Sequence, residues 1–244
     1  MNLSVVVPVH NESANIAPLI IELTNALDGK YDYELIYVDD ASTDDTAIQL
    51  ERMMTRYPRL RVIKHRVCCG QSMAIFSGVK AAASPLIATL DGDMQNDPKD
   101  IPMLVATYMD HRTEGDVMVI GLRVNRQDTL WRKISSKIAN SVRRSLLKDQ
   151  ASDTGCGLKV FSRALFLSMP YFDHMHRFLP ALAGRANAPV FSVAVNHRSR
   201  SHGISNYGTL DRLKAGIVDL AGVLWLLKRF NHPHAIEVNS HADH

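Results

Sequence analysis

The sequence predicts an α/β protein with a doubly wound, mostly parallel sheet and amphipathic helices in its C-terminal part. Over the first 122 residues, short apolar runs alternate with helical patterns. The runs SVVVP, LIYV and VMVIG are continuously apolar, which is typical of parallel strands covered on both faces. The chain has 244 residues, 46% of them hydrophobic, and this is enough to bury one sizeable core.

Each predicted strand is followed by a helical pattern. We expect strands at 3–8, 34–38, 61–65, 85–90 and 116–121, and helices at 13–27, 44–57, 70–83 and 98–111. Residue types that cap helices precede the first two helices, namely Asn11 or Ser13 and Ser42 or Thr43. Such a βαβ series places ligand sites at the carboxyl ends of the strands.

The character of the chain changes after Asp128. Residues 130–147 predict a basic amphipathic helix, which either packs on the sheet with its basic face in water or contacts a membrane. A strand is expected at 190–196. Residues 210–230 predict a helix that serves as a core helix, a dimer contact or an interfacial membrane anchor. We divide the chain into one domain at 1–230, with halves at 1–122 and 123–230, and a tail at 231–244. The tail is expected to be flexible, and the alternative is that its four histidines bind a metal.

The distribution of charge and the cysteines bear on the binding partners and on the cellular location. The net charge of +3 gives no reason to expect nucleic acid, but basic residues gather at 123–148 and 197–202 and suit a phosphate-rich partner or an anionic membrane. Cys68, Cys69 and Cys156 suggest no disulfide framework, which favours a cytoplasmic location. We find no secretory-signal pattern and no apolar stretch of the length that spans a bilayer. Peripheral membrane contact, self-association or a membrane-protein partner is therefore expected.

The run Asp91-Gly92-Asp93-Met94-Gln95 directly follows a predicted strand. Alternate residues of extended chain point to one face, so Asp91, Asp93 and Gln95 can converge. Two carboxylates about 4 Å apart repel by roughly 4 kcal/mol near a protein surface. Mg²⁺ or Mn²⁺ with oxygen ligands would offset that repulsion, whereas the alternative is a polar turn.

Two other predicted strands also end in polar residues. His10-Asn11-Glu12 follows the first strand and Asp39-Asp40 ends the second. Carboxylates at such tips can accept hydrogen bonds from a ribose or a nucleobase. The chain contains no G-x-x-x-x-G-K-[ST] motif, which excludes a P-loop, and no G-x-G-x-x-G follows the first strand.

Taken together, these motifs resemble glycosyltransferase family 2, and in particular its branch of dolichol-phosphate mannosyltransferases and bacterial polyprenyl-phosphate glycosyltransferases. The resemblance covers about residues 2–230 and rests on PVHNE (8–12), VDDASTD (38–44), DGDMQNDP (91–98), GLR (121–123) and RSRSHGISNYG (198–208). It implies a GT-A fold, a UDP- or GDP-linked sugar donor, a divalent metal and inverting transfer to a polyprenyl phosphate.

The resemblance also implies roles for individual residues. The nucleotide-sugar would be bound by Pro8, Val9, Asn11, Glu12, Asp39, Asp40 and Asp91, with Asp40 as the stronger contact to base and ribose. The metal would be held by Asp91, Asp93 and Gln95. Catalytic roles would fall to Asp93, Arg123, Arg132 and Arg200, and the acceptor phosphate would be held by Arg132, Arg198, Arg200, Ser205 and Asn206.

Asn206 departs from the family pattern because many relatives have lysine there, and Gln71 is a second such departure. We expect Arg198 or His202 to supply the missing charge. If the acceptor is a sugar hydroxyl rather than a phosphate, a general base is needed, and Asp153 is the candidate. Two further alternatives are a phospho-acceptor signalling domain and a non-catalytic nucleotide- or lipid-binding subunit. The first is disfavoured because Lys64-His65-Arg66 stands at its acceptor position, and the second because Asp91 and Asp93 are both present.

Overall fold

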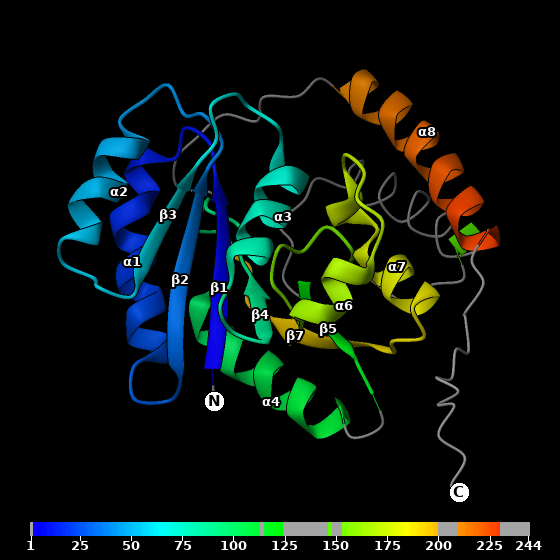
Figure 1. Ribbon diagram of the computed structural model, residues 1–244, viewed down its shortest axis with the longest axis horizontal. Helices are drawn as coiled ribbons and strands as arrows, with labels where there is room; N and C mark the ends of the chain where they lie inside the picture. Colours follow the sequence, from blue (N-terminus) through cyan, green and yellow to red (C-terminus); the bar gives the residue numbers. More distant parts are fainter. Residues whose placement is uncertain (1, 113–114, 124–145, 148–152, 200–208, 230–244) are drawn as a thin grey trace, which may run out of the picture.

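The computed structural model describes residues 2–112, 115–123, 146–147, 153–199 and 209–229 (Figure 1). Arg132, Arg200, Ser205 and Asn206, most of the predicted basic helix and the predicted tail lie outside these residues.

The first half follows the predicted alternation of strands and helices. Its elements are β1 (Asn2–Val9), α1 (Ser13–Leu27), β2 (Asp32–Asp39), α2 (Thr46–Met54), β3 (Leu60–Lys64), α3 (Gln71–Ala81), β4 (Leu86–Thr89), η1 (Pro98–Asp100), α4 (Ile101–His111) and β5 (Met118–Arg123). The second half contains β6 (Lys159–Ser162), α6 (Arg163–Ser168), η3 (Met175–Arg177), α7 (Leu179–Arg185), β7 (Val190–Val195) and α8 (Thr209–Lys228).

The strands form one seven-stranded sheet in the order β3-β2-β1-β4-β6-β5-β7. β1 pairs in parallel with β2 and β4, β2 with β3, and β5 with β7. β6 is antiparallel to both of its neighbours, β4 and β5. The mixed, mostly parallel α/β sheet expected from the apolar runs is therefore confirmed, and strands from both halves of the chain contribute to it.

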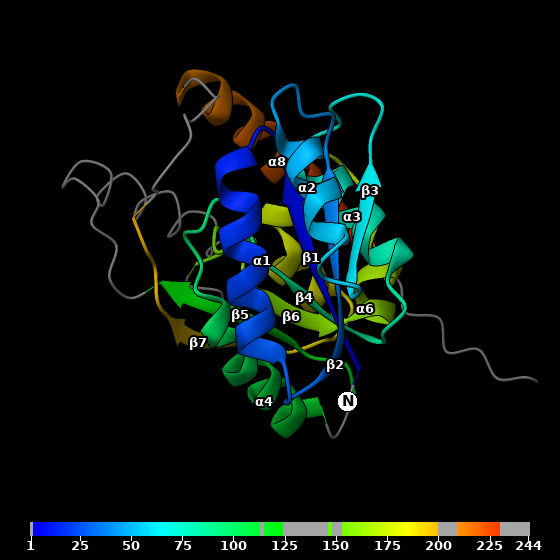
Figure 2. The same cartoon turned by 90° about the vertical axis from the view of Figure 1, so that its left-hand side faces the viewer.

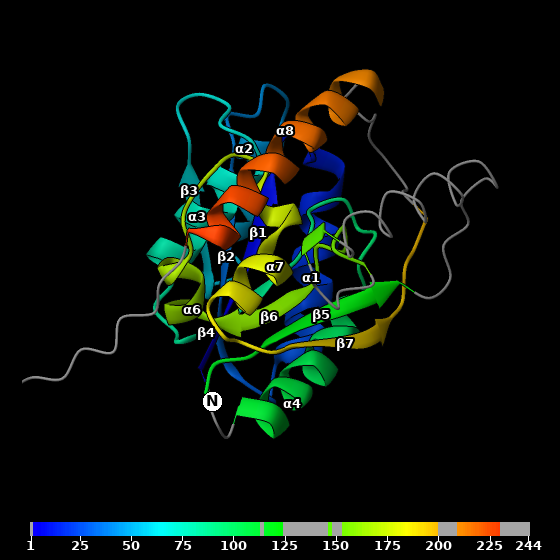
Figure 3. The ribbon, with the colours of Figure 1, turned by 90° about the vertical axis from the view of Figure 1, so that its right-hand side faces the viewer.

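Helices cover both faces of this sheet (Figures 2 and 3). Alternate residues of β1 belong to different cores, since Val5 and Val7 pack with the residues of α1, α2 and α4, whereas Val6 packs with those of α3, α6 and α7. Burial on both faces explains why the strands read as continuous apolar runs.

The elements between residues 159 and 185 were not predicted from the sequence. β6 has four residues, α6 six and α7 seven, which is too short for a helical or alternating pattern to emerge. Ser162 caps α6 by accepting a hydrogen bond from the Leu165 amide.

Helix α8 packs one side against α7. Val223 is fully buried there, with Leu220, Leu224 and Leu227 around it. Ile217, Val218 and Trp225 instead expose 60–70% of their surface. Among the described residues, no helix is both long and apolar enough to cross a membrane.

Candidate active site

The loops that follow β1, β2 and β4 lie at the same edge of the sheet. These three strands are adjacent and parallel, so their carboxyl ends meet. The backbone joins them, because the Asp40 amide donates to the Val9 carbonyl over 2.9 Å and the Leu90 amide donates to the Val6 carbonyl over 3.2 Å. The three polar segments predicted to converge are therefore brought together.

Asn11 fastens the loop after β1 to the loop after β2. Its backbone amide donates to Ser42 Oγ over 2.9 Å, and its side-chain oxygen accepts from the Thr43 amide over 2.7 Å. The Glu12 amide donates to Thr46 Oγ1 over 2.9 Å. Asn11 adopts a left-handed φ of 58°, which asparagine tolerates better than most residues. The structure thus gives Asn11 a role in shaping the pocket predicted for the nucleotide.

Asp39 and Asp40 are both buried but have different surroundings. Asp39 Oδ1 accepts from the Ser42 amide over 2.9 Å, while its Oδ2 is buried without a hydrogen-bond partner among the described residues. The carboxylate of Asp40 accepts from the Cys69 and Gly70 amides over 2.8 and 2.7 Å. Asp40 therefore holds the loop before α3, and Asp39 has the unengaged oxygen, although the sequence favoured Asp40 as the base contact.

Two glycines allow the backbone to approach Asp91. A Cβ at Gly92 would lie 2.6 Å from Val9 Cγ1 and 3.1 Å from the Pro8 carbonyl oxygen, so Pro8 and Val9 pack under the loop after β4. A Cβ at Gly157 would lie 2.2 Å from the Asp91 carboxylate. Because neither position has room for a side chain, both glycines are needed to hold the carboxylate where it is.

The pKa of Asp91 is raised to about 6, first by burial and then by the charge of Asp93. Lys159 and Arg123 act in the opposite direction, as does the hydrogen bond of 2.8 Å that Gln71 Nε2 donates to Asp91 Oδ1. The carboxylate therefore lies among cationic groups that only partly offset the cost of its ionisation.

Asp93 and Gln95 continue the loop. Asp93 Oδ1 accepts from the Gln95 amide over 3.2 Å, and Gln95 Nε2 donates to the Arg198 carbonyl over 3.4 Å. The guanidinium of Arg198 makes ion pairs of 2.7 Å with Glu22 and 2.9 Å with Asp97. Its charge, predicted to hold the acceptor phosphate, is thus already shared between two carboxylates.

Arg123 and Asp153 form a bidentate ion pair. Nε and Nη2 of Arg123 donate to the two carboxylate oxygens of Asp153 over 2.6 and 2.7 Å. Burial lowers the pKa of Arg123, but the ion pair with Asp153 outweighs it, so the pKa is raised overall. This arrangement fixes a guanidinium at the end of β5, near Asp91.

Lys159 is a site residue that sequence reasoning missed. It is 4% exposed, its Nζ donates to the Cys156 carbonyl, and its charge acts on Asp91 and Asp153. Burial lowers the pKa of Lys159, while the neighbouring anionic groups act to raise it. Little in the sequence pointed to this role, because a lysine in a four-residue strand ordinarily indicates a surface position.

The paired carboxylates have the chemistry of a site for a hard divalent cation. Burial, and after it the charge of Asp93, raise the pKa of Asp91, and a cation bound between the two carboxylates would relieve their repulsion. Carboxylate and amide oxygens are preferred ligands of Mg²⁺ and Mn²⁺. The residues present therefore fit such an ion.

The mostly parallel sheet, with acidic loops at the carboxyl ends of β2 and β4, has the arrangement that the sequence motifs predicted for a GT-A fold. Residues 4–168 match the model of the family "Glycosyl transferase family 2", which is more than half of the chain. The protein therefore belongs to glycosyltransferase family 2, as the motifs predicted.

Similar proteins act on lipid phosphates, according to their names. The chain is 37% identical to dodecaprenyl-phosphate galacturonate synthase of Rhizobium johnstonii over 233 residues, covering 93% of this chain and 68% of that protein. It is 34% identical to undecaprenyl-phosphate 4-deoxy-4-formamido-L-arabinose transferase of Aeromonas hydrophila over 209 residues, covering 85% and 63%. Both relatives are longer than the part that this chain matches.

Solved structures share the fold. The glucosyl-3-phosphoglycerate synthase of Mycobacterium tuberculosis, in a complex with Mn²⁺, UDP and glucosyl-3-phosphoglycerate, superposes with a TM-score of 0.67 and 23% identity, covering 93% of this chain and 79% of that one. Its complex with Mg²⁺ and UDP gives a TM-score of 0.68 at 22% identity. At this identity the likeness bears on the fold alone.

Proposed function

We propose that this protein transfers a sugar, with inversion, from a nucleotide-diphosphate sugar to a polyprenyl phosphate at the cytoplasmic face of a membrane. The observation that carries the proposal is the carboxylate pair Asp91 and Asp93, set at the strand ends beside Arg123 and Lys159. The names of the two relatives support the lipid phosphate as acceptor. We further propose that residues 1–230 act as one domain.

The donor would bind across the carboxyl ends of β1, β2 and β4. Asp39, with its buried and unengaged Oδ2, is suited to accept a hydrogen bond from a base or ribose. Asn11 and Glu12 hold the loops that would enclose the nucleotide. The diphosphate would then lie toward Asp91, where Arg123 supplies positive charge.

Asp91, Asp93 and Gln95 would hold Mg²⁺ or Mn²⁺ in this site. When bound, the ion supplies charge stabilisation for the leaving diphosphate. Gln71 and Gly157 orient the Asp91 carboxylate. Arg123, which Asp153 orients, would place its planar guanidinium near the charge of the leaving diphosphate.

A lipid phosphate acceptor removes the need for a general base. A phosphate monoester is already anionic near pH 7, so the protein has only to position it and compensate its charge. The alternative, transfer to a saccharide hydroxyl, would require Asp153 to accept a proton. Both oxygens of Asp153 are engaged by Arg123, which favours the phosphate acceptor. Arg132, Arg200, Ser205 and Asn206 remain predicted contacts to that phosphate.

Helix α8 is suited to peripheral membrane contact. Ile217, Val218 and Trp225 are exposed on it, and Lys228 stands in its last turn. An amphipathic helix with a tryptophan and flanking cations is the kind of segment that lies in the headgroup region. The predicted basic helix at 130–147 would add attraction to anionic lipid.

A transfer assay tests this function. The purified chain with Mg²⁺ or Mn²⁺ is offered a panel of UDP- and GDP-sugars, with and without a short polyprenyl phosphate, and release of the nucleotide diphosphate is measured. Lipid-dependent release that EDTA abolishes, and that Asp93→Asn reduces at least a hundredfold, is the expected result. A product on a saccharide hydroxyl, with none on the lipid, would overturn the proposed acceptor.

A further inference from the structure

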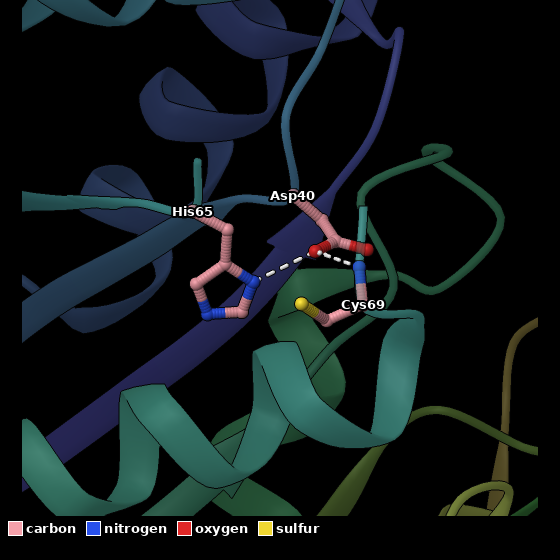
Figure 4. A group of neighbouring side chains, drawn as sticks. All are labelled: Asp40, His65 and Cys69. Carbon is pink, nitrogen blue, oxygen red and sulfur yellow. Dashed lines mark hydrogen bonds and ion pairs between the residues drawn. The ribbon is translucent and has the colours of Figure 1, made fainter. Parts of the chain in front are cut away.

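A second cluster of metal-binding side chains lies beside the carboxyl end of β2. A carboxylate oxygen of Asp40, a ring nitrogen of His65 and Sγ of Cys69 all lie within 4.8 Å of one another (Figure 4). Sγ of Cys68 is 3.3 Å from Oδ2 of Asp40 but is not one of the three atoms in this group. The cluster shares no residue with the pair Asp91 and Asp93, and it differs from that pair in offering sulfur and imidazole.

The ligand atoms are close to the spacing that a tetrahedral ion requires. Bonds of about 2.0–2.3 Å to oxygen, nitrogen and sulfur place neighbouring ligand atoms roughly 3.3–3.8 Å apart. Nδ1 of His65 is 2.7 Å from Oδ1 of Asp40, and the sulfur of Cys69 lies within 4.8 Å of both groups. Small side-chain rotations that lengthen the distance between His65 and Asp40, and shorten the distances from both to the Cys69 sulfur, would accommodate an ion.

The surrounding structure already orients these ligands. The backbone amides of Cys69 and Gly70 hold the Asp40 carboxylate, and Ser77 Oγ lies 2.9 Å from Nε2 of His65. Histidine ligands in metal sites commonly have their second ring nitrogen engaged in this way. The cluster therefore has a second layer of contacts as well as ligand atoms.

We propose that Asp40, His65 and Cys69, with Cys68 as the fourth ligand, form a binding site for Zn²⁺ or another thiophilic divalent cation. Thiolate and imidazole favour such ions, whereas the carboxylates of Asp91 and Asp93 suit Mg²⁺ or Mn²⁺. The site is built by the loop from His65 to Gly70, which carries both thiols and is already attached to Asp40.

Binding would release protons in a defined number. The two thiols each lose a proton to solvent and form S–metal bonds. For a neutral His65, coordination through Nδ1 leaves the imidazole proton on Nε2, which then donates to Ser77 Oγ. The Nδ1 contact with Asp40 and the Cys68 hydrogen bond to Asp40 are replaced by metal–ligand bonds. Two protons, one from each thiol, are therefore released for each ion that binds while His65 is neutral.

Cobalt titration of the full chain tests the site. Co²⁺ is added in the presence of saturating Mg²⁺ and a non-thiol reductant, and the thiolate-to-cobalt charge-transfer absorption is recorded. Histidines near the C-terminus could also bind Co²⁺, so the starting protein has alanine in place of four of them, namely His232, His234, His241 and His244. We expect one Co²⁺ per chain with a charge-transfer band, and displacement of that Co²⁺ by Zn²⁺.

Matched variants separate this site from other metal sites. Cys69→Ser and His65→Gln should each weaken Co²⁺ binding at least tenfold and reduce or shift the band, while thermal unfolding confirms that they fold. Cys156→Ser, which removes a buried thiol outside the cluster, and Asp93→Asn should leave the titration unchanged. Absence of the band, or a band unaffected by both cluster variants, would overturn the proposal.

This test is independent of the proposed transfer reaction because it contains no sugar donor. Asp40 also lies in the predicted nucleotide pocket, so Zn²⁺ at this site is expected to lower donor binding if that prediction holds. Failure of the transfer assay would leave the cobalt result intact, and failure of the cobalt titration would leave the transfer assay intact.

Discussion

Replacing Gly157 by alanine is expected to displace the Asp91 carboxylate while leaving the Asp91 side chain itself unaltered. The new Cβ would lie 2.2 Å from Cγ and Oδ2 of Asp91 and 2.4 Å from Oδ1, where ordinary contact begins at 3.4 Å. The loop is not free to retreat, because Thr89 Oγ1 donates a hydrogen bond of 2.7 Å to the Gly157 carbonyl. The carboxylate must therefore move by about 1 Å.

The size of the effect follows from this displacement. Misplacing a site group by about 1 Å can cost roughly a hundredfold in rate, equivalent to about 2.7 kcal/mol. Overpacking of this kind also lowers the free energy of unfolding by about 1–3 kcal/mol. We expect Gly157→Ala to bind Mn²⁺ more weakly and to lose about a hundredfold in kcat/KM for the sugar donor.

The assay combines Mn²⁺ binding by electron paramagnetic resonance with steady-state turnover, and urea unfolding measures stability. The matched control is Gly184→Ala on α7, where an added Cβ meets no atom within 4 Å. Alanine favours helix over glycine by about 1 kcal/mol, so this control should be as stable as the parent or more so. If Gly157→Ala keeps parental Mn²⁺ affinity and turnover, Asp91 is not constrained as the structure indicates.

Three further predictions concern pH, the buried lysine and α8. Because the pKa of Asp91 is raised to about 6 from an ordinary value of 3.8, Mn²⁺ affinity should rise as pH increases through about 6. The stability of the metal-free protein should fall as pH rises from 3.8 to about 6 and level off above that, and Asp93→Asn should move the Mn²⁺ midpoint and the end of this fall to lower pH. Lys159→Met removes a charge that lowers the pKa of Asp91, so the midpoint of a Mn²⁺ titration against pH should move above 6. Trp225→Ser should reduce cosedimentation with anionic vesicles several-fold at unchanged stability, whereas Val223→Ser, at a buried position of the same helix, should lower the unfolding midpoint.

The sequence predicted the parallel part of the sheet because its strands carry a strong local signal. Continuous apolar runs, separated by helices of two or more turns, are visible without knowledge of distant contacts. β6 lacked that signal because it has only four residues and begins with Lys159, a residue type that ordinarily indicates a surface position. Only its pairing with β4 and β5 buries it, and that pairing is not local.

The candidate site divides in the same way. The convergence of Asp39, Asp40 and Asp91 followed from the rule that parallel strands end at one edge. The partners of Arg198 could not be foreseen, since Glu22 lies 176 positions away in the chain. The sequence indicated which side chains have suitable chemistry, whereas the fold decides which of them are already engaged.

The position of β6 has a consequence for how the protein reaches its folded state. β5 contacts the rest of the sheet through β6, which begins at residue 159, 36 positions after β5 ends at residue 123. The partner of β5 on its other side is β7. During synthesis, β1 to β4 can pair as they emerge, but β5 must wait for residues 159–162 before it is joined to them. Until then the edge of β4 has unpaired backbone groups, and exposed edges of this kind are where misassembly begins. The slow step of folding is therefore expected to be the insertion of β6, which closes the sheet and brings Lys159 to the buried side of Asp91 at the same moment.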